Sequence, residues 1–193
     1  EQIGRVLDAL QANAHADNTI VVFLSDNGMH LGEKSHWLKY TLWEQATRVF
    51  LAVHVPGCPA QSIDSPVSLI DLYPTLVTLC ELGRPGHELD GVDLSRLLAG
   101  ETPDRGRPVL STWGRGNHAI RDERYRYIRY RNGEEELYDH SADEHEWHNL
   151  AGDPQYAQLK TRLAEYLPEF DAPNTEKLDP PMSESEWDNL AFQ

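Results

Sequence analysis

The sequence NTIVVFLSDNGMHLGEKSHWLKYTLWEQATRVFLAVHVPG spans residues 18–57 and carries the strongest fold signal in the chain. Its apolar run at 20–24 is rich in β-branched residues, which predicts a strand buried on both faces of an α/β sheet. Open α/β sheets place their chemistry at the carboxyl ends of strands. We therefore expect a site where this run gives way to Ser25, Asp26, Asn27 and Gly28.

The residues after the strand suit a hard cation. Asp26 offers carboxylate oxygens and Asn27 an amide oxygen, both of which are ligands for Ca²⁺ or Mg²⁺. Gly28 allows the backbone to turn away sharply without a Cβ clash. An ordinary Asn-Gly turn at the end of a strand is the alternative interpretation, and these three residues alone favour it.

The residues that follow point to a specific family. Short motifs succeed one another at fixed spacing: Gly32-Glu33-Lys34, His36-Trp37-Leu38-Lys39, Thr41-Leu42-Trp43-Glu44, Thr47-Arg48-Val49, a second apolar run at 50–55, and Pro56-Gly57. This string resembles the sulfatase family, most closely its iduronate-2-sulfatase-like and choline-sulfatase-like bacterial members. Phe50 stands where that family usually has proline. We expect an altered local backbone there, with the chemistry kept.

The resemblance implies a set of site residues. In sulfatases a divalent cation activates a formylglycine nucleophile, which is made from a C/S-x-P-x-R motif. By resemblance, Asp26 and Asn27 are two metal ligands, with Ca²⁺ favoured over Mg²⁺. Lys39 is the catalytic, sulfate-binding lysine, and His36 and His118 are further candidates for substrate contact. A recurrent family arginine, here Arg48, is interpreted as a structural ion-pair residue near the site.

The nucleophile motif does not occur in this sequence. No C/S-x-P-x-R is present, and Cys58-Pro59-Ala60-Gln61 lacks both the spacing and the arginine. The family's Asp-Asp pair of metal ligands is also missing. The resemblance therefore covers the C-terminal portion of a sulfatase, and we expect a fragment that is inactive alone. We also expect an open strand edge that favours self-association, or a companion chain that carries the N-terminal half.

Three functions stay open. The first is hydrolysis of sulfate esters, carbohydrate or small alkyl sulfates, by the parent protein. The second is a phosphonate or phosphodiester hydrolase of the same alkaline-phosphatase-like superfamily. The third is a non-catalytic binding or assembly module.

Composition limits the partners and the compartment. Of 193 residues, 39% are hydrophobic and 25% charged, which is enough for a folded core. A net charge of −15 argues against binding nucleic acid or an anionic membrane. The two cysteines are too few for a disulfide scaffold. No transmembrane run or signal peptide is evident, and periplasmic, secreted and cytoplasmic locations all stay open.

The remaining sequence predicts an α/β part at 1–104, an α+β subdomain at 105–170 and an extended tail at 171–193. A helix at 1–14 should cover a sheet face, and a core helix should run from Leu69 to near Gly83, with Asp71 outside the site. The strict alternation of side-chain types at 124–130 and the hairpin signal Asn132-Gly133 predict an antiparallel meander. One of its faces should be exposed to solvent and the other packed. Its strands are expected at 108–113, 118–121, 124–130 and 136–139. Residues 143–150 should form a turn and a helix N-terminus, and 154–167 a helix on the sheet.

Overall fold

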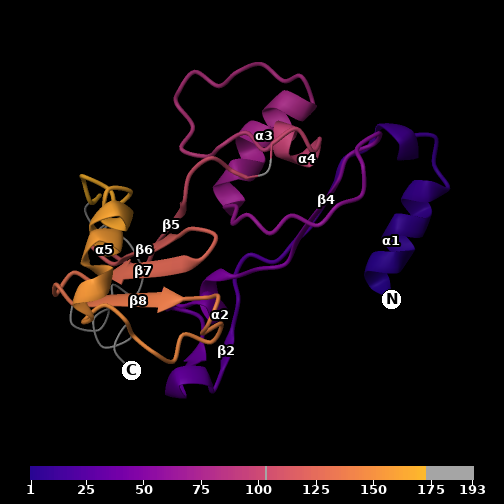
Figure 1. Cartoon of the computed structure of the whole chain (residues 1–193). Coiled ribbons are helices and arrows are strands. Elements are labelled where there is room, and N and C mark those ends of the chain that lie inside the picture. The colour runs from indigo at the N-terminus through magenta and orange to yellow at the C-terminus, as the bar shows by residue number, and fades with distance from the viewer. Residues whose placement is uncertain (103, 173–193) are drawn as a thin grey trace.

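A computed structural model describes residues 1–102 and 104–172 of the chain. It contains a long two-stranded ribbon, a small helical unit and a four-stranded antiparallel sheet (Figure 1). Most of the predicted extended tail, residues 173–193, lies outside the described residues. None of the described helices has the length and apolar character that a membrane crossing requires.

The ribbon pairs β1 (Val21–Leu24) with β4 (Leu51–His54) in antiparallel register, and Leu24 lies opposite Leu51. Both strands were predicted from their apolar runs and are confirmed. The predicted burial of β1 on both faces is wrong for this chain, because Phe23 and Leu24 are exposed. The physical reason is that β4 is the one strand paired with β1 among the described residues, which leaves the other edge of β1 open.

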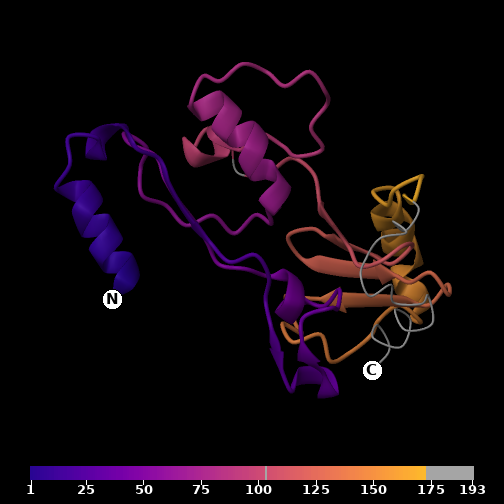
Figure 2. The ribbon, with the colours of Figure 1, turned by 180° about the vertical axis from the view of Figure 1, so that it is seen from behind.

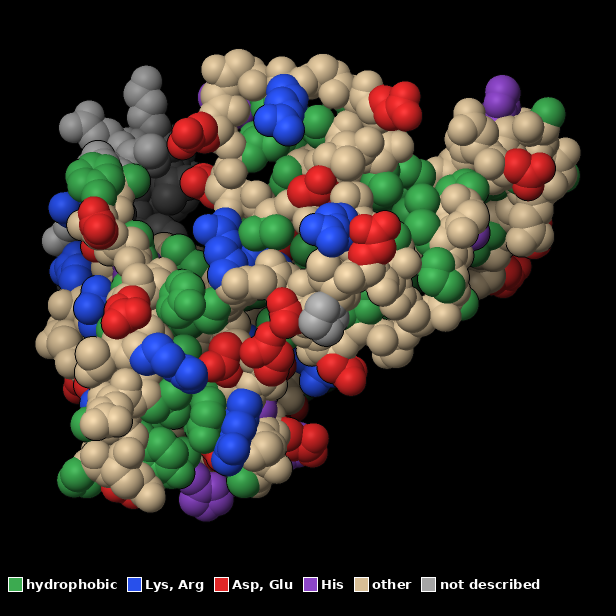
Figure 3. Space-filling view, turned by 45° about the horizontal axis from the view of Figure 1, so that its top comes forward, with side chains coloured by type: hydrophobic (Ala, Val, Ile, Leu, Met, Phe, Trp, Pro, Cys, Tyr) green, Lys and Arg blue, Asp and Glu red, His purple; other side chains and the backbone are tan. Residues whose placement is uncertain are grey.

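The N-terminal helix α1 (Gln2–Gln11) and a 3₁₀ turn, η1 (Ala16–Asn18), stand at the far end of this ribbon (Figures 1 and 2). The helix is confirmed, but its expected cover of a sheet face is not found, since no residue of α1 is buried. Hydrophobic side chains lie along the projecting arm that carries α1 and the ribbon (Figure 3). The apolar stripe of α1 therefore stays exposed; it includes Ile3, Val6 and Leu7.

Between β1 and β4 the chain forms short elements that carry most of the predicted motif residues. These are β2 (His30–Leu31), η2 (Glu33–Ser35), β3 (Trp37–Leu38) and α2 (Glu44–Thr47). Strands β2 and β3 pair as a small antiparallel hairpin. This segment turns back from the ribbon and reaches the C-terminal sheet (Figure 1).

The helical unit consists of η3 (Leu69–Asp71), α3 (Leu72–Leu79) and α4 (Ser95–Leu98). Asp71 is fully buried, and its carboxylate accepts two hydrogen bonds from Arg105 at 2.6 and 2.7 Å. It also accepts from the backbone N–H groups of Ser68 and Val92. Asp71 is thus a structural anchor, in keeping with its predicted place outside the site.

The C-terminal sheet is the predicted meander. Its strands β5 (Val109–Thr112), β6 (His118–Arg121), β7 (Tyr125–Arg129) and β8 (Glu135–Asp139) pair in sequence order. A 3₁₀ turn, η4 (Pro154–Tyr156), leads into α5 (Ala157–Ala164), which packs on one face. That core consists of Ile120, Tyr127, Leu137, Leu163 and Leu167.

The other face of the sheet was predicted to be wet, and this is wrong. Leu42 packs on that face against Ala119, Ile128 and Tyr138. Arg126, from the alternating run, is only 3% exposed. The reason is tertiary: the segment between β3 and α2 covers this face and brings its own polar partners for the arginine.

The segment at 143–150 forms turns, as predicted, but the predicted helix N-terminus is displaced. Helical structure begins at Pro154, where the Asp153 side chain accepts from the backbone N–H of Gln155 at 2.9 Å. Asp153 is a typical N-cap residue for that reason. Within 143–150, Asp143 instead accepts from the N–H of His148 at 2.7 Å and closes a turn.

Removing one partner of the buried Asp71–Arg105 pair should destabilise the fold strongly. Arg105→Met leaves the fully buried carboxylate without its counter-charge, which typically costs about 3–5 kcal/mol. Urea unfolding of the chain, followed by circular dichroism, measures the change. Arg96→Met is the matched control, because the Arg96–Glu101 pair is largely exposed and should contribute little. Equal effects of the two variants would contradict a structural role for Asp71.

Candidate functional site

The candidate site begins where β1 ends. The Gly28 N–H donates to the Ala46 carbonyl at 2.9 Å, which ties the strand end to α2. A Cβ on Gly28 would lie 1.9 Å from the Gln45 carbonyl oxygen. Glycine is therefore required here by close backbone approach, in addition to the turn that the sequence suggested.

The β2–β3 hairpin returns Lys39 to this strand end. His30 lies opposite Leu38 in the hairpin, so the residue after β3 folds back over the residues after β1. The Lys39 ammonium donates to the Asn27 amide Oδ1 at 2.8 Å. Asp26, the neighbour of Asn27, is exposed. The structure thus brings together Asn27 and Lys39, which are twelve positions apart in the sequence.

The backbone around Lys39 is unusual. Leu38 has φ 75° and Tyr40 has φ 51°, so left-handed residues flank Lys39 on both sides. Side chains other than glycine rarely adopt this region, and they do so where the surroundings fix them. The orientation of Lys39 therefore depends on contacts made by the rest of its segment.

Two histidines lie beneath this segment. His36 is buried, and its Nε2 is 3.2 Å from the Lys39 carbonyl oxygen. His30 is fully buried, and its Nε2 is 2.9 Å from the Thr41 hydroxyl. Its ring packs edge-to-face against the ring of His36, with the ring centres 5.1 Å apart. Burial, reinforced by His36, lowers the pKa of His30. In this structure His36, a predicted substrate contact, supports the backbone of Lys39.

The other two predicted residues lie elsewhere. His118 is buried on β6, with Nδ1 2.9 Å from the Thr112 hydroxyl and Nε2 2.8 Å from the Asp171 carboxylate. Its hydrogen bonds thus stay within the C-terminal part. Arg48 is exposed, and its guanidinium forms no ion pair with any described residue. Glu44, four residues earlier, pairs with Arg121 and Arg126.

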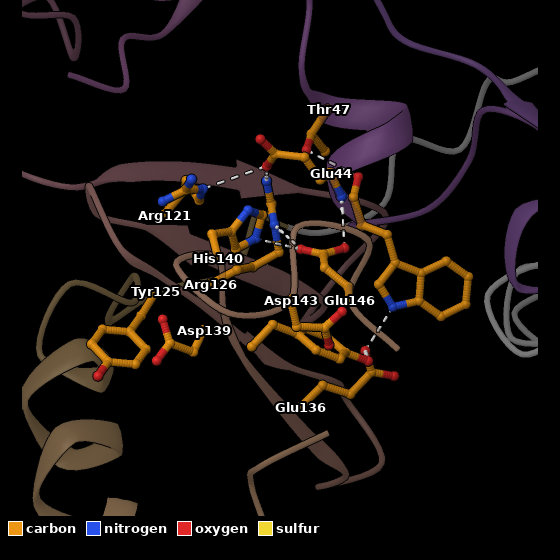
Figure 4. Close-up of polar contacts among 12 residues, drawn as sticks. Glu44, Thr47, Arg121, Tyr125, Arg126, Glu136, Asp139, His140, Asp143 and Glu146 are labelled. Carbon is orange, nitrogen blue, oxygen red and sulfur yellow. Dashed lines mark hydrogen bonds and ion pairs between the residues drawn. The ribbon is translucent and has the colours of Figure 1, made fainter. Parts of the chain in front are cut away.

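A buried charge cluster beside the site was not predicted (Figure 4). Arg126 pairs with Glu44, and its Nε is 2.7 Å from Glu146 Oε1. His140 Nε2 lies 2.9 Å from the same oxygen of Glu146. Burial alone would raise the pKa of Glu44, but the adjacent Arg126 outweighs it and the pKa is lowered. The sequence predicted a solvent-exposed face for the alternating run around Arg126, and a turn with a helix N-terminus for the segment around Glu146, so neither pattern indicated a buried cluster.

This cluster does not suit a metal ion, although its geometry permits one. Ligand atoms of Glu44, His140 and Glu146 lie within 4.8 Å of one another. The guanidinium groups of Arg126 and Arg121 together balance the charges of Glu44 and Glu146, so a cation there would meet positive charge. Asp26 and Asn27 have the better donor chemistry, one carboxylate and one amide oxygen. They supply only part of a six-ligand shell, and Asn27 Oδ1 already accepts from Lys39.

Comparison with known proteins gives the class and then the family. The sulfatase family model matches residues 1–82. A sulfatase from Formosa agariphila is 37% identical over 172 residues, covering 89% of this chain and 34% of that protein. A solved 2-O GAG sulfatase superposes with a TM-score of 0.73 at 31% identity, covering 83% of this chain and 38% of the other. A phosphonate monoester hydrolase from Silicibacter pomeroyi superposes with a TM-score of 0.74 at 29% identity. The match covers 84% of this chain and 36% of the other.

The fold is accordingly that of the alkaline-phosphatase-like class. Within this class the chain belongs to the sulfatase family. It spans about a third of the length of the curated relative described above.

Calcium binding by this chain should be weak. Asp26 and Asn27 offer too few oxygens for Ca²⁺, so we expect a dissociation constant of about 0.1 mM or weaker. Calorimetric titration of the chain with CaCl₂ measures it. Asp26→Ala tests the site, with Asp17→Ala, another exposed aspartate near the ribbon, as control. Tight stoichiometric binding that only Asp26→Ala removes would contradict this expectation.

Acidification should weaken the fold through His30. Its folded pKa lies below the ordinary value of 6.5, so the unfolded chain binds the proton more tightly. The free energy of unfolding therefore falls as pH drops through 6.5 toward the lower folded pKa. His30→Gln should lose less stability than wild type between neutral pH and about pH 5.5. Exposed His145→Gln should keep the wild-type pH dependence, and identical slopes for all three proteins would rule out His30 as the source.

Proposed function

We propose that this chain supplies the cation-binding and sulfate-binding side of an enzyme that hydrolyses sulfate esters, either carbohydrate sulfates or small alkyl sulfates. The observation that carries the proposal is the 2.8 Å contact between Lys39 Nζ and Asn27 Oδ1 at the carboxyl end of β1. It joins a cation to a metal-type oxygen donor at the place where open α/β sheets hold their sites.

The proposed roles follow from the chemistry of each side chain. Asp26 and Asn27 would hold a divalent cation, Ca²⁺ in preference to Mg²⁺. Such a cation polarises a sulfate oxygen when bound. Lys39 donates to a sulfate oxygen and offsets negative charge that develops during cleavage of the ester bond. His36 keeps the Lys39 carbonyl in place from beneath. The sequence has no C/S-x-P-x-R motif, so no nucleophilic step is assigned to its own residues.

A second function in the same superfamily has specific support. The TM-score to a phosphonate monoester hydrolase, 0.74, is close to the TM-score to a sulfatase, 0.73. A metal-type donor pair and a lysine serve a tetrahedral phosphonate as well as a sulfate, since both carry their charge on outer oxygens. The relative rates on an aryl sulfate and an aryl phosphonate ester separate the two.

A non-catalytic role as a binding or assembly module is the alternative of another class. The exposed stripe of α1 and the open edge of β1 support it, because such surfaces favour pairing with another chain. This role does not involve Lys39. Variants of Lys39 therefore distinguish it from both hydrolase functions.

Lys39→Ala should lower kcat/KM for an aryl sulfate by about a hundredfold or more, since it removes a charge directed at the reacting group. The assay needs a protein with the nucleophile motif, and a C/S-x-P-x-R codon run upstream of Glu1 would identify it. Lys160→Ala is the matched control, because Lys160 pairs with Glu135 on the C-terminal sheet at 2.6 Å. Unchanged turnover of the aryl sulfate by Lys39→Ala would contradict the proposed role of Lys39. Faster cleavage of the phosphonate ester than of the aryl sulfate by the unmodified enzyme would favour the second function.

A further inference from the structure

We propose that the C-terminal sheet positions Lys39 and that Glu146 is a positioning residue for the site; this inference rests on the proposed function of Lys39. Glu146 does not contact the Lys39 ammonium. It acts through the segment at 33–44, which carries Lys39 and lies against the sheet. The structure shows how each end of that segment is held.

The N-terminal end of the segment is held through Lys34. Its ammonium lies over the rings of Trp43 and Tyr138, 4.7 and 4.6 Å from their centres. It donates to the Tyr138 hydroxyl at 3.1 Å and to the backbone carbonyl of Glu146. Cation–π contacts strengthen when the cation is shielded from water. Burial lowers the pKa of Lys34, against the opposing effect of Glu136 and Glu146.

The C-terminal end is held by hydrogen bonds to three side chains of the C-terminal part. The Leu42 carbonyl accepts from Arg126 at 2.9 Å, and the Glu44 N–H donates to Glu146 Oε2 at 2.9 Å. The indole N–H of Trp43 donates to the Glu136 carboxylate at 2.6 Å. The carbonyl of Leu42 and the N–H of Glu44, on either side of Trp43, are thus held by the C-terminal part of the chain.

Glu146 contacts both ends. Its backbone carbonyl accepts from Lys34, and its carboxylate accepts from the Glu44 N–H. The other carboxylate oxygen faces Arg126 and His140. Glu146 is 1% exposed, so removing its charge leaves Arg126 without one of its buried partners.

The middle of the segment depends on these ends. Leu38 and Tyr40 adopt left-handed backbone on either side of Lys39. Such residues relax to ordinary conformations unless neighbouring contacts oppose it. In addition to the contacts at the two ends, Tyr40 in the middle of the segment packs on Trp113, with the ring centres 4.9 Å apart. Loosening an end should therefore release Lys39 from Asn27 before it unfolds the sheet.

The experiment uses the whole chain and measures the chemical accessibility of Lys39 directly. Acetylation by acetic anhydride, followed by mass spectrometry, gives the labelling rates of Lys39 and of Lys160 as an internal reference. Amide hydrogen exchange of residues 33–43 is measured in parallel. Glu146→Gln keeps the size of the side chain but removes its charge. We expect Lys39 labelling and segment exchange to rise about tenfold, with Lys160 unchanged.

Asp139→Asn is the matched control. Asp139 is also a largely buried, ion-paired carboxylate on the sheet, but it pairs with Arg124 at 2.6 Å and lies outside the contacts of the segment. This variant should leave Lys39 labelling unchanged. Lys34→Met is the second test variant, which keeps an unbranched apolar side chain and removes the ammonium. It should also raise the labelling rate of Lys39, and it decides the outcome if Glu146→Gln does not fold.

Unchanged Lys39 labelling in a folded test variant would overturn the proposal. An equal increase in the acetylation rates of Lys39 and Lys160 would also overturn the proposal, because that outcome indicates general destabilisation. These readouts need no sulfate hydrolysis. A failed positioning role is therefore distinguishable from a failed catalytic role, which the turnover of Lys39→Ala reports.

Discussion

The guanidinium of Arg126 lies between two carboxylates that come from distant parts of the chain, Glu44 and Glu146. A charge that is 3% exposed is expensive to bury unless it is paired and hydrogen-bonded on several sides. Arg126 donates hydrogen bonds to the Leu42 carbonyl, at 2.9 Å, and to Glu44, while its Nε is paired with Glu146 by charge and has no hydrogen-bond partner among the described residues. The sheet can therefore bury this arginine only while the segment beside Lys39 lies against it. Burial of Arg126 and arrangement of the site are coupled by this requirement.

The chain uses a second buried arginine in the same way. Arg105 joins Asp71 with two parallel hydrogen bonds and connects the helical unit to the strand that enters the sheet. Replacing such pairs by apolar residues is often neutral for stability, so their value lies in fixing which segments meet. The Glu44–Arg126 pair and the Trp43–Glu136 hydrogen bond cross the predicted division at residue 104. The two parts accordingly share one polar interface beside the site.

The sequence predicted what depends on short-range pattern. The run before Ser25 predicted a strand from its β-branched residues, and the alternation around Tyr127 predicted one because a period of two fixes which face each residue takes. Asn27 and Lys39 were placed in one site by a motif, and the structure shows them in contact. Arg126 and Glu146 could not be placed in this way. Their partners are set by tertiary packing, since Glu44 is 82 positions from Arg126, and a polar residue in an alternating strand ordinarily faces water.

The partner of Lys39 bears on how an acidic chain could attract an anionic substrate. With 32 acidic and 17 basic side chains, the long-range field of the protein repels sulfate esters. Any attraction must come from cations whose charge is not already neutralised nearby. Arg105, Arg126 and Lys160 are paired with carboxylates. Lys39 donates instead to the neutral amide of Asn27. An amide orients the ammonium without cancelling its charge, so Lys39 keeps its charge available to an arriving oxyanion while the surrounding acidic surface repels anions elsewhere.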